Sequence, residues 1–312
     1  WLEIRELQCQ LGLNLRTLAS YRQTVETVEQ RFAGGVAPAL EVRLARQNLL
    51  AAEAAVPEVR QRLRGAIRRL EILAGQYPGA VAVPADEATV MEALMPAPLP
   101  GVPVGLPSTL LERRPDLIAA EASLHASVAN VGAARARLYP TLSLTGSAGY
   151  NSSELDTWFD STSDVWSLVG NLVMPLINRG ATKAEIRAAE ARAQQAVAGY
   201  RQAVLAAFAE VENALDADRF QARREAALTR SVREARRSLE LAERRYQSGL
   251  DSLLSTLESQ RRLLNAESQL LSTQRAHRAA RVDLIQALGG PWDLALEDRG
   301  LAAADHQQGD RP

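Results

Sequence analysis

Residues 28–76 read VEQRFAGGVAPALEVRLARQNLLAAEAAVPEVRQRLRGAIRRLEILAGQ, and residues 242–290 read AERRYQSGLDSLLSTLESQRRLLNAESQLLSTQRAHRAARVDLIQALGG. The two stretches align without a gap, 214 residues apart. Equivalent residues fall in register at Arg31 and Arg245, Phe32 and Tyr246, Gly35 and Gly249, Leu40 and Leu254, and Glu53 and Glu267. A repeat of this length predicts an architecture built from two related helical halves.

Long helices surround the first copy. Over residues 1–33 apolar side chains recur every seven positions, which is typical of a coiled-coil seam: Ile4, Leu11, Leu18, Val25 and Phe32. Gly35 then interrupts the pattern, and a second helix is predicted over 38–73. Two long helices joined by a short break predict an antiparallel hairpin with an exposed tip.

The second copy has the same plan with a longer first helix. The helical pattern is almost unbroken over 181–247, which corresponds to roughly 100 Å at the rise of an α-helix. Gly249 ends it, and a last helix is predicted over 251–288. A shorter helix over 115–138 precedes this hairpin. No ordinary globular core needs a helix of 67 residues, so an extended architecture is expected.

Two segments between the helices alternate with a period of two residues. Over 141–150 leucines and small residues alternate with Thr and Ser, and a second strand is predicted over 166–177. Each strand has the length and the alternation of a tilted transmembrane β-strand with a wet interior. From periodicity alone, a hairpin on a soluble domain has equal standing.

Two strands cannot close a barrel, and lipid does not tolerate an open sheet edge. The repeat offset predicts that the strand pair of the first copy lies upstream of Trp1, so we expect the chain to be a fragment of a longer protein. Four strands in a complete subunit are still too few, so several subunits are expected to pool their strands.

Composition argues against several function classes. The net charge is −1 and Lys183 is the only lysine among 36 basic residues, so nothing indicates nucleic-acid binding. Cys9 is the only cysteine and is predicted to be a buried, inert thiol. No run of 18 apolar residues occurs. Three histidines are isolated in sequence: His125, His277 and His306. No nucleophile or phosphate-binding motif occurs either. The sequence therefore predicts no enzyme activity, no metal site and no cofactor.

The repeat and the proline distribution suggest four parts. The first is 1–77, the helical hairpin of an incomplete first repeat. Residues 78–107 hold seven of the 14 prolines and are the predicted linker. The second repeat spans 108–290, with its helix, two strands and long hairpin. The polar tail 291–312 is predicted to be disordered.

One stretch carries a specific resemblance. Residues 110–117 read LLERRPDL, and the chain continues as AAEASLHASVANVGAARARLYPTLSLTGSAGY up to Tyr150. Together with the Arg-aromatic-x-x-Gly motifs at the two tips, this stretch resembles the TolC-like outer-membrane efflux family, specifically the OprM-type lipoprotein subunits of RND-type pumps. The resemblance covers about residues 1–290.

The resemblance implies a mainly α fold with a small β part. A homotrimer would form a 12-stranded β-barrel in the outer membrane, continued by a tunnel of long antiparallel coiled-coil helices (an α-barrel) in the periplasm. The linker 78–107 would belong to an equatorial belt. The family's acylated, palmitate-bearing cysteine would lie upstream, because Cys9 does not match it. Implied partners are outer-membrane lipid, a periplasmic adaptor protein and an inner-membrane RND transporter.

The resemblance also assigns a periplasmic gate to the helix after the second tip. Leu254, Glu258 and Arg261 match the family's apolar residue, carboxylate and arginine, with Glu258 in place of the usual Asp. Spacings of four and three put them on one helix face, and three-fold symmetry would turn each into a ring. A carboxylate ring favours cations and raises its own pKa by mutual repulsion. The alternative is a solvated helix face.

The resemblance assigns roles to the tips as well. Glu41 matches a residue that helps latch the closed state, and Tyr246 is its expected partner; the alternative is a solvated Glu and a packed tyrosine. The two tips are the expected docking sites for the adaptor hairpin, through Arg31, Phe32, Gly35, Arg245, Tyr246 and Gly249.

These expectations define one favoured function and two alternatives. The favoured function is a passive outer-membrane duct for the export of drugs and small toxic compounds in a multidrug efflux pump, gated at its periplasmic tips. The same channel could instead serve protein secretion of type I. A soluble coiled-coil scaffold, whose β-hairpin packs on its own helices, is the third reading.

Overall fold

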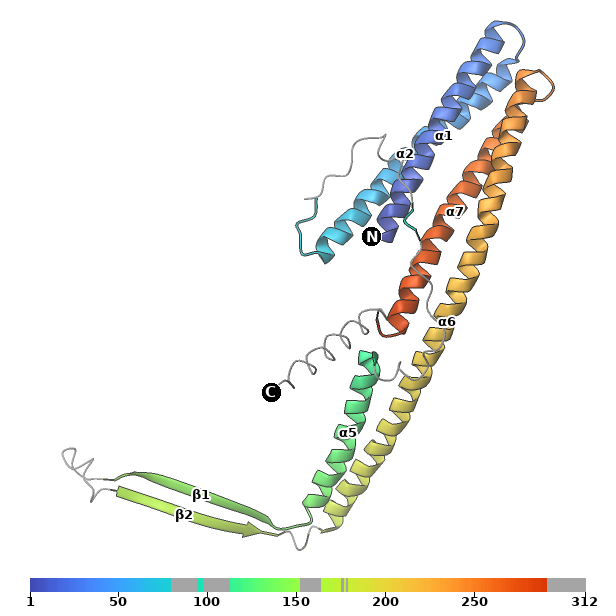
Figure 1. The fold of residues 1–312 in the computed structure, drawn as a ribbon. Coiled ribbons are helices and arrows are strands. Elements are labelled where there is room, and N and C mark those ends of the chain that lie inside the picture. The colour runs from blue at the N-terminus through green and yellow to red at the C-terminus, as the bar shows by residue number, and fades with distance from the viewer. Residues whose placement is uncertain (80–94, 98–112, 152–163, 175–176, 178, 291–312) are drawn as a thin grey trace, which may run out of the picture. The chain divides into compact units, whose positions relative to one another are not determined.

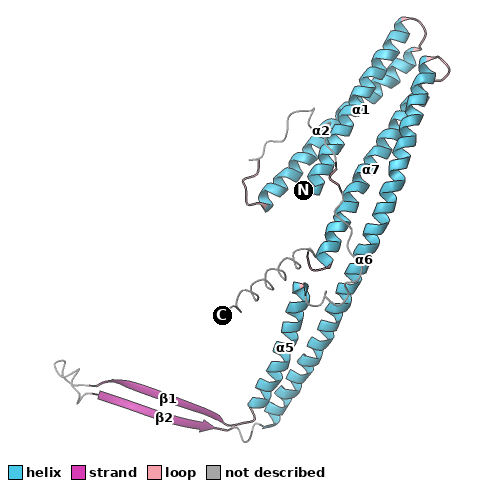
Figure 2. Ribbon diagram, viewed as in Figure 1, coloured by secondary structure: helices cyan, strands magenta, loops and turns pink. Residues whose placement is uncertain are grey.

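A computed structural model of the chain describes residues 1–79, 95–97, 113–151, 164–174, 177 and 179–290. Within these ranges the elements in chain order are α1 (Leu2–Ala33), α2 (Ala39–Leu73), α5 (Pro115–Ala136), β1 (Thr141–Tyr150), β2 (Asp164–Val173), α6 (Arg179–Gln247) and α7 (Leu253–Ala287) (Figure 1). Helices dominate, and the two strands form a single hairpin (Figure 2). The expected mainly α fold with a small β part is confirmed.

The helix ends lie close to their predicted positions, whereas the second strand was predicted wrongly at both ends. It covers Asp164–Val173 rather than 166–177. The reason is its pairing, because β2 runs antiparallel to β1 with Thr141 opposite Val173 and Tyr150 opposite Asp164. The partner strand therefore fixes both ends, and the period of a single segment does not contain this information. The tail 291–312 and most of the predicted linker lie outside the described residues.

The chain divides into two compact units. Unit 1 comprises Trp1–Gly105 and Glu210–Pro312, and unit 2 comprises Leu106–Ala209. Helix α6, with 69 residues, belongs to both. The boundary between units therefore does not follow the boundary between the sequence repeats, and the four-part division by repeats stays a prediction.

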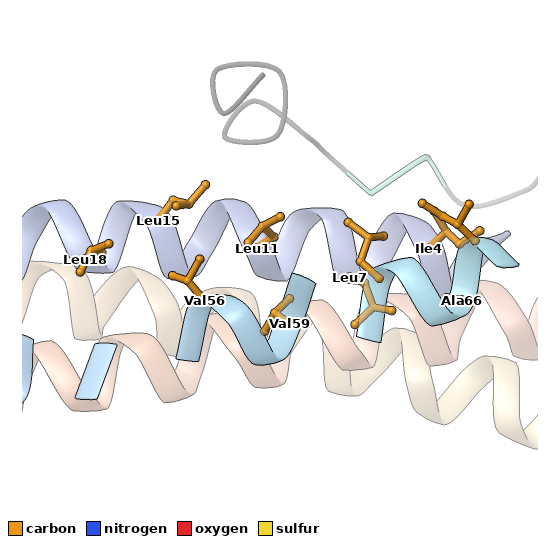
Figure 3. Packing of buried hydrophobic residues seen from close by; sticks show 10 residues of the cluster. Ile4, Leu7, Leu11, Leu15, Leu18, Val56, Val59 and Ala66 are labelled. Carbon is orange, nitrogen blue, oxygen red and sulfur yellow. The ribbon is translucent and has the colours of Figure 1, made fainter. Parts of the chain in front are cut away.

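In unit 1 the coiled-coil seam of α1 packs against α2. Side chains of both helices gather along the hairpin in one cluster (Figure 3). The buried cluster consists of Ile4, Leu7, Leu11, Leu15 and Leu18 from α1 and Val56, Val59, Leu63, Ala66 and Ile67 from α2. Burying one such side chain contributes about 1.5–3 kcal/mol, so this seam is the main reason the first hairpin holds together. Cys9 is buried beside it, and burial raises the pKa of its thiol, as an inert cysteine requires.

A second buried cluster of unit 1 joins both hairpins near their tips. It combines Tyr21 and Val28 of α1, Val42 and Ala45 of α2, Tyr246 of α6, and Leu253 and Leu257 of α7. Polar contacts extend this union along α1 and α7. The amide of Gln260 donates to the hydroxyls of Ser20 and Thr24, at 3.1 and 2.9 Å. The two repeated hairpins of unit 1 thus lie side by side with their tips together (Figure 1).

In unit 2 the β-hairpin has two chemically different faces. The register places Leu142 opposite Leu172 and Ala148 opposite Trp166 on one face. The other face is mixed: β1 contributes hydroxyls, the Oγ atoms of Ser147 and Ser167 lie 2.8 Å apart, and β2 adds Val165, Val169 and Val173. Every residue of both strands is exposed. This hairpin therefore leaves its whole apolar face without cover from the described chain.

Helix α5 and the first part of α6 form the helical portion of unit 2. Two ion pairs link them, Arg135 with Glu190 at 2.6 Å and Arg137 with Glu185 at 2.8 Å. Such exposed pairs contribute little to stability. A search of the described helices finds none with both the length and the hydropathy needed to span a bilayer.

Candidate functional site

The two tips have the same backbone. Gly35 and Gly249 adopt left-handed conformations, with φ of 71° and 72°. At the first tip the amide of Val36 donates to the carbonyl of Arg31, and at the second the amide of Leu250 donates to that of Arg245, at 2.9 and 2.8 Å. This is the Schellman arrangement, in which a left-handed glycine ends a helix. Glycine is required at both positions because a side chain at this φ is strained.

The same arrangement closes the second helix of each repeat. Gly75 after α2 and Gly289 after α7 have φ of 70° and 84°. The amides of Gln76 and Gly290 donate to carbonyls five residues earlier, at 2.8 and 3.0 Å. Gly75 and Gly289 are equivalent positions of the repeat, so the duplication preserves its helix ends as well as its tips.

The aromatic residues of the tips occupy different environments. Tyr246 is only 5% exposed and packs among Val28, Val42 and Leu253, whereas Phe32 is 48% exposed. Phe32 continues the predicted seam of α1, but it lies in the last turn of the helix, next to the exposed tip. The expectation that Phe32 packs in the seam is therefore wrong.

The structure brings Glu41 and Tyr246 together. The hydroxyl of Tyr246 donates a hydrogen bond of 2.9 Å to Oε2 of Glu41. Burial, then the hydrogen bond to Glu41 and the charge of that carboxylate, together raise the pKa of Tyr246 to about 12, against the opposing effect of Arg31. Tyr246 is therefore protonated at every physiological pH and remains a hydrogen-bond donor.

The two tip arginines make different contacts. Nη1 of Arg31 donates to the backbone carbonyls of Tyr246 and Gln247, at 3.2 and 3.1 Å, and its guanidinium carbon lies 4.7 Å from the centre of the Tyr246 ring. Arg245 instead forms an ion pair of 3.3 Å with Asp251, which lies six residues later, on the other side of its own turn. Arg31 thus connects two hairpins, whereas Arg245 braces one.

Asp251 also organises the start of α7. Its Oδ1 accepts hydrogen bonds from the amide of Ser252 at 2.8 Å and from the hydroxyl of Ser255 at 2.9 Å. The bond from Ser255, then that from Ser252, and then Arg245 hold the pKa of Asp251 below its usual range. A carboxylate at a helix N-terminus is stabilised by the unpaired amides there.

The predicted gate residues lie on one face of α7. Leu254 is 65% exposed, and Glu258 accepts hydrogen bonds of 2.8–2.9 Å from Arg261. Arg262 also donates to Glu258, at 2.8 Å. The sequence interpretation missed Arg262, although its spacing of four residues from Glu258 indicates such a pair.

The electrostatics of Glu258 in the single chain are opposite to those expected of a carboxylate ring. The hydrogen bonds from Arg261 and Arg262 hold the pKa of Glu258 below its usual range. The expected increase depends on repulsion between three copies. Any ring of Glu258 carboxylates therefore starts from groups that two arginines already partly neutralise.

A further cluster of charged residues lies between α6 and α7, far along the helices from the tips. Nδ1 of His277 is 2.7 Å from a Glu225 carboxylate oxygen, and Arg278 lies 3.3 Å from the same oxygen. Burial pushes the pKa of Glu225 up, but His277 and Arg278 outweigh this effect and hold it below its usual value. Arg281 pairs with Asp218 at 2.8 Å.

His277 is isolated in sequence but not in the fold, because Glu225 is 52 residues distant in sequence and only the packing of α6 on α7 brings the two together. In the part of the chain that the structure describes, no three His, Cys, Asp or Glu residues are grouped as a metal site would need.

Comparisons with known proteins agree with this geometry. The family model described as "Outer membrane efflux protein" matches residues 106–290. Outer membrane protein OprJ of Pseudomonas aeruginosa is 37% identical over 91% of this chain and 58% of its own length. Toluene efflux pump outer membrane protein TtgI of Pseudomonas putida is 36% identical over 92% of this chain and 60% of its own. The solved structure of the outer-membrane channel OprN superposes with a TM-score of 0.82 at 30% identity, covering 93% of this chain and 64% of that one. The chain thus spans about three fifths of the length of these relatives.

Proposed function

The chain belongs to the outer membrane efflux protein family, and we propose that it forms part of an outer-membrane channel, the passive duct of a tripartite RND-type efflux pump. The observation that carries the proposal is the β1–β2 hairpin, whose twenty residues are all exposed. One face of it is rich in leucine, and the other combines hydroxyl groups from β1 with valines from β2. A strand pair with one continuous apolar face and one partly polar face fits the wall of a pore.

The hairpin is poorly suited to water. Leu142 and Trp166 are 76% and 77% exposed, and their face also includes Leu144, Leu168 and Leu172. A long apolar strand edge in water is a site of aggregation, and two strands alone are marginally stable. Lipid on the apolar face and further strands at both edges would prevent aggregation and stabilise the hairpin. This supports a homotrimer that closes a 12-stranded barrel.

The exposed hairpin also weighs against the scaffold alternative. A soluble coiled-coil scaffold requires the hairpin to pack on the chain's own helices, and every residue of β1 and β2 is exposed. Secretion of type I would use the same channel architecture, but the relative TtgI is, by its description, the outer membrane protein of a toluene efflux pump. Efflux of drugs and small toxic compounds is therefore the favoured role.

We further propose the functions of the tip residues. Leu254, Glu258 and Arg261 share the exposed face of α7 and would line the narrowest part of the tunnel as three rings. The hydrogen bond from Tyr246 to Glu41 would hold the tips in the closed state. The exposed turns at Gly35 and Gly249 would dock the periplasmic adaptor, which connects the duct to the inner-membrane transporter.

The proposal is tested with the full-length protein. We expect it to sediment with the outer membrane as a detergent-stable trimer and to form channels of defined conductance in planar bilayers. Replacing Leu254 and Glu258 together by Ala should raise the conductance, because the rings at the narrowest point become smaller.

The repeat supplies a matched control for this experiment. Leu40 and Leu44 stand at the equivalent places of the first copy, so their double replacement by Ala should leave the conductance unchanged. A protein that stays monomeric in buffer without detergent would contradict the proposed function. Equal conductance of all three proteins would contradict only the assignment of the gate.

A further inference from the structure

We propose that Arg31 is a tether that holds the two hairpin tips together and so restrains the duct in its closed state. The restraint on the duct rests on the proposed function, whereas the tether between the tips follows from contacts within unit 1. Arg31 is a positioning residue in this proposal. It acts on the second hairpin through the backbone at the end of α6 and through the ring of Tyr246.

The geometry of Arg31 suits this role. Arg31 lies in the last turn of α1, and its side chain crosses to a helix more than 200 residues later in the chain. One nitrogen, Nη1, donates to two carbonyls there, those of Tyr246 and Gln247. The guanidinium also stacks on the Tyr246 ring at 4.7 Å, within the range of cation–π attraction.

One of the two acceptors of Arg31, the carbonyl of Gln247, needs a donor. The last four carbonyls of a helix have no amide partner within it. At the end of α6 the local turn supplies amides to Arg245 and Tyr246, through Leu250 and Gly249. Arg31 supplies the donor to Gln247. A cation at this point also opposes the partial negative charge of a helix C-terminus, so the site favours an arginine electrostatically.

The repeat shows that this contact is not a by-product of the turn motif. Arg245 has the same position in the same Schellman arrangement, yet its guanidinium pairs with Asp251 inside its own hairpin. In the first copy the position equivalent to Asp251 is Ala37, which offers no carboxylate to hold Arg31 locally. The first arginine is therefore released from its own turn and reaches across to the other hairpin.

The tether is chemically distinct from the Glu41–Tyr246 hydrogen bond. The latch needs the tyrosine hydroxyl, whereas Arg31 binds two backbone carbonyls and one aromatic face. Replacing Tyr246 by Phe therefore removes the latch and leaves the tether intact. Replacing Arg31 by Met removes the tether and leaves the Glu41 hydrogen bond in place. The two restraints can be measured separately.

The first test measures the distance between the tips. Nitroxide labels on Val36→Cys and Leu250→Cys, two exposed positions, are placed in a Cys9→Ala background of the full-length protein and diluted with unlabelled protein. Double electron–electron resonance should give a longer and broader distance in Arg31→Met. Arg245→Met is the matched control and should leave the distribution unchanged. Unchanged distances in Arg31→Met, or equal changes in both variants, would overturn the tether.

The second test measures the duct. A lost charge-assisted hydrogen bond is equivalent to about tenfold or more in an equilibrium, so Arg31→Met should raise the open probability in planar bilayers by about that factor. Arg31→Lys keeps a donor but loses the planar stack and should lie between Met and wild type. A merely structural role would lower the thermal midpoints of the variants without this order of open probabilities.

The outcomes of the second test separate the two proposals. Absence of any channel in the wild type would defeat the proposed function, while the distance measurement would still decide the tether. Normal channels with an unaltered open probability in Arg31→Met would defeat the restraint on the duct.

Discussion

At the first tip Phe32 is 48% exposed and Arg31 reaches out of its own hairpin; at the second tip Tyr246 is 5% exposed and Arg245 stays within its own. The backbones of these tips are nevertheless the same, with one left-handed glycine and the same pair of amide bonds at each. The duplicated motif therefore encodes a turn, while its neighbours in space determine which side chains are buried and which contacts they make. Tyr246 is the buried aromatic residue because side chains of α1 and α2 pack onto it.

The largest difference between the two tips is expected when their aromatic side chains are truncated. Tyr246→Ala should lower the free energy of unfolding by about 3–5 kcal/mol, because it leaves a cavity among Val28, Val42 and Leu253. Phe32→Ala should change it by less than about 1 kcal/mol, since Phe32 is half-exposed. Denaturant unfolding of both variants checks the difference, and similar losses would show that the burial is not asymmetric.

Because the two tips share one backbone conformation, substitutions of their glycines should have equal effects on stability. Gly35→Ala and Gly249→Ala should each cost about 1–2 kcal/mol, because an L-residue is strained at φ near +70°. No atom lies within 4 Å of the added Cβ at either tip, so the backbone conformation alone sets the cost. Thermal unfolding should show equal shifts for the two variants. A clear inequality would mean that the turns differ in the folded protein.

The burial of Tyr246 should also make the stability of the protein depend on pH. Its folded pKa of about 12 lies above the ordinary value of 10, so the folded state holds this proton more tightly than the unfolded state. The corresponding stability is fully present below pH 10 and is lost as the pH rises toward 12. Burial also raises the pKa of Tyr21. Absorbance titration of tyrosinate should therefore show late-titrating tyrosines in the wild type, and Tyr246→Phe should remove one of them. An unchanged number of late-titrating tyrosines in that variant would contradict the raised pKa of Tyr246.

The smallest expected effect concerns Glu258, whose place in the first copy is taken by Leu44. Removing both Arg261 and Arg262 as Gln should raise the pKa of Glu258, because their hydrogen bonds hold it low. Stability at neutral pH should not change measurably, since the group is ionised either way and the pairs are exposed. NMR titration of labelled glutamate side chains measures the shift. An unchanged pKa would contradict the hydrogen bonds.

Local signals predicted much of the fold. The seven-residue spacing of Ile4, Leu11 and Leu18 predicted the seam that α1 buries against α2, and the glycines predicted the turns. The same spacing predicted a packed Phe32 wrongly, because a periodic pattern does not show where packing against the partner helix stops. Both ends of the second strand were predicted wrongly for a related reason, since pairing with β1 sets its limits.

The candidate site divides in the same way. The resemblance placed Glu41 and Tyr246 near each other, and the structure has them hydrogen-bonded at 2.9 Å. Arg262 lies within four residues of Glu258 and could have been read from the sequence. The contacts of Arg31 with Tyr246 and of His277 with Glu225 could not, because each joins helices that are distant in sequence.

The sequence by itself determined the elements, the repeat and the two tip turns, because helix periodicity and the glycine at a left-handed position are local properties of the chain. Only the tertiary structure decided which repeated side chain is buried and which arginine crosses between hairpins. Burial and charge-assisted hydrogen bonds depend on the neighbours that packing supplies, and the two copies of the repeat have different neighbours.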